Sequence, residues 1–171
     1  TSDRIDYSND TATAAVKGSL SASRYSPAAT GNLLYGYFSG GYAPAKTTID
    51  RIDYANDTAT ATTKGPLSLA RYSLAATGNV SYGYFAGGRA SPTYTTVDRI
   101  DYSNDTATAS VKGPLSGARY FLCATGTSTF GYFGGGSAPD FSTIGRIDYA
   151  NDTATAAVKG PLSVARSGSA A

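Results

Sequence analysis

The stretch DRIDYSNDTATA at Asp3–Ala14 occurs four times in this chain with almost no change. It returns as DRIDYANDTATA from Asp50, DRIDYSNDTATA from Asp98 and GRIDYANDTATA from Gly145, a period of 47 or 48 residues. A repeat of this length must be accommodated by any fold assigned to the chain. Two explanations compete for the conserved carboxylates: a tandem catalytic or metal site, and a structural element stacked against its own copies.

Two other motifs recur in the same order within each period. One is RYSPAATGN at Arg24–Asn32, and the other is YGYFSGG at Tyr35–Gly41. Both return in later periods, as RYSLAATGN at 71–79, RYFLCATGT at 119–127, YGYFAGG at 82–88 and FGYFGGG at 130–136. Each motif predicts a short strand bounded by turn residues such as Gly, Asn, Asp and Pro.

The opening motif predicts a strand, a turn and a second strand. In RIDY, Ile5 and Tyr7 alternate with Arg4 and Asp6, which places the two pairs on opposite faces. SNDT supplies an Asx-type turn, and TATA continues as a strand of small residues. Four strands in each period of about 47 residues predict an all-β fold of four-stranded antiparallel sheets.

Composition agrees with this class and excludes several functions. All 12 acidic residues are Asp, and helix formers such as Glu, Lys, Leu and Met are scarce while Tyr, Thr and Gly are abundant. The net charge is only +2, so we expect no nucleic-acid partner. The chain has no apolar run of membrane-spanning length, so we expect no membrane insertion.

The three motifs together resemble the Kelch repeat family. The resemblance consists of an Arg-led first strand, an aromatic strand ending in a glycine doublet, and the Tyr-bearing RIDY strand before a polar hairpin. The family has a Trp in the fourth strand, where this chain has TATA. Near-identical arrays of this kind are also similar to ones encoded by marine bacteriophages.

The resemblance implies a β-propeller and assigns an order to the strands. The chain is expected to form one domain or segment, 1–171, with repeats starting at 3, 50, 98 and 145. Within one blade the innermost to outermost strands are expected at 24–31, 35–41, 48–54 and 58–62. The chain then holds nearly four blades, which implies part of a larger ring or an oligomeric ring that self-associates through open blade edges.

Catalytic chemistry finds little support in the residues. The chain has no His, which removes the usual general base and the imidazole metal ligand. Asp6, Asn9 and Asp10 offer oxygen ligands, but no Gly or Glu completes a known calcium loop. We therefore expect no enzyme activity, no catalytic residue, no metal and no cofactor.

Arg and Asp of each RID motif are instead expected to be structural, paired with each other or across neighbouring sheets. These residues are Arg4, Asp6, Arg51, Asp53, Arg99, Asp101, Arg146 and Asp148.

Specificity is expected where the copies differ most, between the second and third strands of each period. These loops share one surface on a repeated scaffold, as binding loops often do. The candidate binding residues are Tyr42, Lys46, Arg89, Tyr94, Asp140 and Phe141. We expect a non-enzymatic structural or binding module of a virion or extracellular appendage, with a protein or glycan surface as its partner. The alternatives are a lectin-like carbohydrate-binding propeller and a glycan-acting hydrolase.

Overall fold

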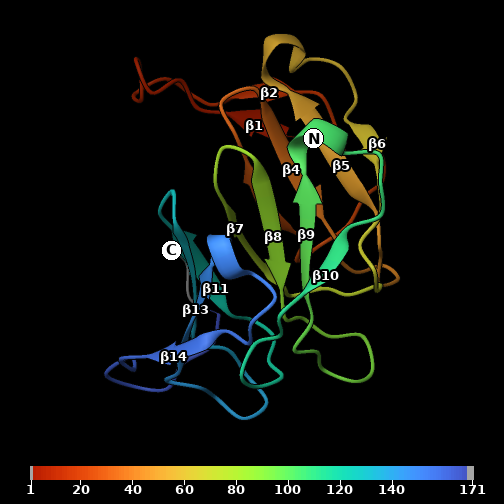
Figure 1. The fold of residues 1–171 in the computed structure, drawn as a ribbon. Helices are drawn as coiled ribbons and strands as arrows, with labels where there is room; N and C mark the ends of the chain where they lie inside the picture. Colours follow the sequence, from red (N-terminus) through yellow and green to blue (C-terminus); the bar gives the residue numbers. More distant parts are fainter. Residues whose placement is uncertain (1, 169–171) are drawn as a thin grey trace.

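The computed structural model describes residues 2–168 and contains antiparallel sheets that follow one another along the chain (Figure 1). An N-terminal pair, β1–β2, precedes three sheets of four strands each. The pair consists of β1 (Ser2–Arg4) and β2 (Ala15–Lys17). The first sheet consists of β3 (Ala28–Gly31), β4 (Tyr35–Ser39), β5 (Ile49–Asp53) and β6 (Thr62–Lys64).

The second and third sheets repeat the first in the same strand order. The second consists of β7 (Ala75–Gly78), β8 (Tyr82–Ala86), β9 (Val97–Asp101) and β10 (Ser110–Lys112). The third consists of β11 (Cys123–Gly126), β12 (Phe130–Gly134), β13 (Ile144–Asp148) and β14 (Ala157–Lys159). The all-β class and the repeated four-stranded sheets predicted from the sequence are confirmed.

Each RIDY strand ends in a single turn of 3₁₀ helix in these three sheets. The turns are Tyr54–Asn56, Tyr102–Asn104 and Tyr149–Asn151. The fourth strand then begins later than the sequence predicts, at Thr62 and not at Thr58. The N–H of Ala61 bonds to the carbonyl of Ser19 in the preceding loop, 2.9 Å away. Most of this TATA segment therefore lies against the loop that follows β2 and does not pair with β5.

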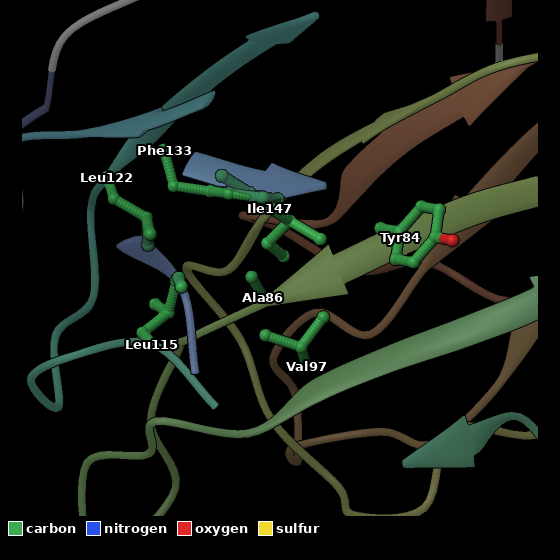
Figure 2. Close-up of a cluster of buried hydrophobic side chains, with 9 residues drawn as sticks. Tyr84, Ala86, Val97, Leu115, Leu122, Phe133 and Ile147 are labelled. Atoms are coloured by element: carbon green, nitrogen blue, oxygen red, sulfur yellow. The ribbon is translucent and has the colours of Figure 1, made fainter. Parts of the chain in front are cut away.

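Neighbouring sheets pack face to face because the second strand of a sheet carries apolar side chains on both faces. In β8, Phe85 faces the first sheet, while Tyr84 and Ala86 face the third. This alternation follows from the two-residue period of a strand. Figure 2 shows the interface of the second and third sheets, where Val97 and Leu115 also lie. Burial of these side chains is the main favourable term in holding the array together.

The strands β3, β7 and β11 lie next to one another along one side of the array. A run of main-chain hydrogen bonds joins the turns that precede them. The N–H of Ser73 bonds to the carbonyl of Ser26, that of Phe121 to Ser73, and that of Gly168 to Phe121. Ser26, Ser73 and Phe121 share a φ of 54°, so the same turn recurs in each sheet. Residues 2–168 form no closed ring.

Candidate binding surface

The Arg of each of the first three RID motifs binds the next sheet along the chain. Nη1 of Arg51 lies 2.8 Å from Oδ2 of Asp105, and Nζ of Lys64 lies 3.3 Å from Oδ1. The hydroxyl of Tyr37 donates to the same carboxylate, at 2.9 Å. One sheet further, Asp152 receives Arg99, Lys112 and Tyr84, and one sheet earlier Asp57 receives Arg4 and Lys17. Cross-sheet pairing is therefore present, with the Asp of the NDT turn as the acceptor.

The Asp of each RID motif has a different partner from the one predicted. Asp53 accepts the N–H of Ala55 at 2.9 Å and so caps the first 3₁₀ turn. Asp101 and Asp148 do the same for the next two turns, and Asp6 accepts the N–H of Ser8. A carboxylate at the end of a strand satisfies the free N–H groups of the turn that follows. Arg146 lies over the ring of Phe130, 4.2 Å from its centre.

Electrostatics indicate that this network is structural. Burial and the hydrogen bond to Asp105 raise the pKa of Tyr37 above its usual range, and Asp152 acts in the same way on Tyr84. Burial alone would lower the pKa of Arg51, but the charge of Asp105 and the hydrogen bonds to Asp105 and Tyr37 together outweigh burial, and the pKa is raised. Neutral tyrosine donors and charged arginines thus share the carboxylates of Asp105 and Asp152.

A row of aromatic and Arg side chains crosses the sheets at the end where the inner strands begin. The aromatic ladder consists of Tyr25, Tyr42, Tyr72, Arg89, Tyr120 and Phe121. The ring centres of Tyr25 and Tyr42 lie 5.2 Å apart, and those of Tyr42 and Tyr72 lie 4.8 Å apart. The guanidinium carbon of Arg89 lies 5.9 Å from the ring centre of Tyr72 and 4.7 Å from that of Tyr120.

Two backbone features place these side chains in one row. Isolated bridges pair Tyr25 with Tyr42 and Tyr72 with Arg89, joining the turn before each inner strand to the variable loop. The N–H of Gly41 bonds to the carbonyl of Arg71 in the next sheet, at 3.0 Å. With φ of +106°, Gly41 adopts a conformation that favours glycine. The glycine doublet therefore directs each variable loop toward the following sheet.

Several ladder side chains are open to solvent. Tyr25 is 56% exposed, Tyr42 39% and Phe121 44%. A shallow hollow of about 210 Å³ adjoins the ladder, lined in part by Ser26, Ser73 and Phe121. Exposed aromatic rings with an interleaved Arg are unusual on a surface that has no binding role.

The structure brings together two of the six predicted binding residues, Tyr42 and Arg89. Lys46, Tyr94 and Phe141 occupy one equivalent position, half-buried, and each N–H bonds to a carbonyl of the glycine doublet. Asp140 is exposed and accepts a hydrogen bond from the hydroxyl of Ser137, at 2.8 Å.

Sequence reasoning missed four ladder residues, namely Tyr25, Tyr72, Tyr120 and Phe121. The first three belong to the RY pair that opens each inner-strand motif, whereas binding residues were expected only where the copies differ. The sequence feature that could have identified them is the adjacent Arg and Tyr of each RY pair. Neighbouring side chains in extended backbone point to opposite sides, so a buried Arg places the next Tyr toward the surface.

Within residues 2–168, no group of three or more His, Cys, Asp or Glu side chains is arranged to hold a metal ion. The same part of the chain has no helix of the length and apolarity that crossing a membrane requires. A scan against protein-family models and a search of curated proteins both found no match to the chain.

Proposed function

We propose that this chain is a non-enzymatic binding module of the Kelch-like β-propeller type, which contacts a protein or glycan surface through its aromatic ladder. Three observations support the propeller: the sheets have four antiparallel strands each, they pack face to face, and their first strands β3, β7 and β11 are neighbours. The single observation that carries the binding role is the row of exposed and half-buried rings that includes Arg89.

Ring and guanidinium side chains suit such a role for energetic reasons. Tyr and Arg provide large contact areas and lose little conformational freedom when they are already packed against one another. Arg89 is held between Tyr72 and Tyr120, so its orientation is set before any partner arrives. Repetition of the ladder from sheet to sheet multiplies weak contacts into useful avidity, as a virion or extracellular appendage requires.

A lectin-like role is the second candidate, favoured by the exposed faces of Tyr25 and Tyr42. Aromatic faces stack on the apolar faces of sugar rings, and the neighbouring serines supply polar groups. Hydrolysis is the weaker alternative, because the chain has no His and the turn carboxylates are shared by Arg, Lys and Tyr.

The test is binding to a glycan array and to a panel of cell and virion surface proteins, with three variants in parallel. Tyr42→Ala and Arg89→Ala should each weaken binding at least about tenfold, the loss of a central contact. Leu33→Ala is the matched control, since Leu33 is 92% exposed at the opposite end of the strands and should bind normally.

Binding confined to glycans would support the lectin. Release of sugar from any glycan on the array would overturn the non-enzymatic assignment. An equal loss of binding in Leu33→Ala would show that the aromatic ladder is not the binding surface.

A further inference from the structure

The third sheet lacks a carboxylate that the first two place beside a buried arginine. Nη2 of Arg24 lies 2.7 Å from Oδ2 of Asp50, and Nη1 of Arg71 lies 3.0 Å from Oδ2 of Asp98. All four side chains are fully buried. In the third sheet the same position is Gly145.

The strand register establishes this equivalence independently of sequence alignment. Asp50 pairs with Phe38 in the first sheet, and Asp98 pairs with Phe85 in the second. Gly145 pairs with Phe133 in the third. The three residues therefore occupy one site in the repeated sheet.

Arg119 remains buried in the third sheet even though its carboxylate is missing. Its exposed fraction is 0%. Nη1 donates to the carbonyl of Thr143 at 2.9 Å, Nη2 donates to that of Phe133 at 3.2 Å, and Nε has no hydrogen-bond partner. No ion pair of Arg119 is found within residues 2–168. Carbonyl dipoles alone leave its charge uncompensated.

The guanidinium faces the position where the Asp side chain stands in the other sheets. A Cβ placed on Gly145 would lie 3.2 Å from Nη2 of Arg119. Its next neighbours would be Cβ of Ala156 at 3.5 Å and Cδ2 of Leu115 at 4.0 Å. The position is therefore bounded by one cation and two apolar groups, and a side chain there meets no backbone atom at close range.

A second donor borders the same position. Ser21 donates its N–H and hydroxyl to Asp50, at 2.9 and 2.7 Å, and Ser68 donates its N–H to Asp98 at 3.1 Å. The corresponding Ser116 is exposed, and its N–H makes no hydrogen bond to any residue in the range 2–168. Ser116 directly follows Leu115, whose Cδ2 borders the position, so its N–H is the equivalent donor in the third sheet.

The surroundings of Arg119 offer little other compensation. Burial lowers the pKa of Arg119, and the effect is opposed only by the thiol of Cys123. That thiol donates to the carbonyl of Gly134, at 3.5 Å. The ring of Phe141 lies on another side, with its centre 5.5 Å from the guanidinium carbon.

We propose that the third sheet binds one small anion of carboxylate or halide type between the guanidinium of Arg119 and the N–H of Ser116, in the place that Asp50 and Asp98 fill in the other sheets. This site is separate from the aromatic ladder and does not depend on the binding role proposed for it. Formate is the natural probe, because it is the carboxylate group of Asp without the rest of the residue.

Thermal unfolding in increasing formate tests the proposal on three proteins in identical buffers. The melting temperature of the natural chain should rise with the logarithm of formate concentration, by roughly 5 °C between 1 and 100 mM. Gly145→Asp supplies the missing carboxylate, so its melting temperature should be higher without formate and nearly independent of it. Asp98→Gly recreates the open position in the second sheet and should show a larger formate dependence than the natural chain.

Equal formate responses in all three proteins would indicate a general salt effect and overturn the proposal, as would no response in the natural chain. Should Gly145→Asp fail to fold, Arg119→Met provides the comparison, because removal of the cation should abolish the response to formate. Crystals soaked in bromide give a direct readout: an anomalous peak beside Arg119 is expected, and its absence at saturating bromide would refute the site.

Discussion

At the scale of single residues, the carboxylate of the NDT turn has the largest structural role. Asp105 and Asp152 each gather an arginine, a lysine and a tyrosine hydroxyl from the preceding sheet. Once the first contact fixes the carboxylate, the second and third contacts cost little further conformational entropy of the Asp side chain. The repeated NDT turn is therefore best explained as a cross-sheet anchor.

Replacing Asp105 by Asn should lower the free energy of unfolding by about 2–4 kcal/mol, since Arg51 and Lys64 lose their counter-charge while partly buried. Chemical denaturation followed by circular dichroism measures the change. Asp10→Asn is the matched control, because Asp10 is the same turn residue in the first copy and is exposed there. Its effect should stay within about 0.5 kcal/mol. Similar losses in both variants would show that the turn, and not the cross-sheet contact, is the stabilising element.

The sequence predicted the pairing of the RID arginines but not their acceptor. Alternation placed Arg51 and Asp53 on one face of a strand, and the opposite charges predicted pairs within a motif or across neighbouring sheets. The acceptor is 54 positions away in the chain, and only the packing of sheets brings it near. The ladder was missed for a related reason: the row through Tyr42, Tyr72 and Tyr120 exists only once consecutive sheets lie side by side.

At the scale of elements, the KG step at the ends of β6 and β10 joins each of these strands to the following sheet. The N–H of Gly113 bonds to the carbonyl of Asp152, at 2.8 Å. A Cβ on Gly113 would overlap the carbonyl of Ala154, and one on Gly65 would overlap that of Ala107. Glycine is required here by close backbone approach and not by an unusual φ.

Gly113→Ala should therefore destabilise the chain by about 1–3 kcal/mol through overpacking at the interface of the second and third sheets. Gly160→Ala makes the same substitution at the equivalent step after β14, where a Cβ meets nothing within 4 Å. That control should change the free energy of unfolding by less than about 0.5 kcal/mol. The pair is measured by denaturation under one set of conditions, and an equal effect at both sites would contradict the close approach.

Element positions followed from the sequence with two systematic differences: the first strand begins at Ala28 and not at Arg24, and the fourth begins at Thr62 and not at Thr58. The second and third strands lie within the predicted ranges, because alternation and the glycine doublet define them locally. The fourth strand starts at Thr62, since the residues before it satisfy their backbone groups on the preceding loop. The local sequence pattern is the same whether a segment pairs within its own sheet or bonds to another repeat. The pattern alone therefore does not reveal which of the two occurs.

At the scale of the whole molecule, each sheet contacts mainly its neighbours in the chain. The two apolar clusters lie between the first and second sheets and between the second and third. Stability in such an array is close to a sum of unit and interface contributions.

Duplicating residues 51–98 in tandem should add one sheet and one interface without disturbing the others. The denaturant m-value should rise about 1.2- to 1.3-fold, in proportion to the added buried area. The measurement is urea unfolding of the two chains at equal concentration. An unchanged m-value with a second, separate transition would show that the added unit does not join the cooperative array.

The run of main-chain hydrogen bonds through Ser26, Ser73, Phe121 and Gly168 has a consequence for diversification. Phe121 stands where two other repeats have serine and the last has Gly168, yet its φ is the same 54° as that of the serines. The backbone of this turn is thus kept with a small polar or a large aromatic side chain, while its positive φ disfavours β-branched residues. A library randomised at these turn positions should sample many surface chemistries on one invariant backbone, which makes the array a scaffold for selecting new binders.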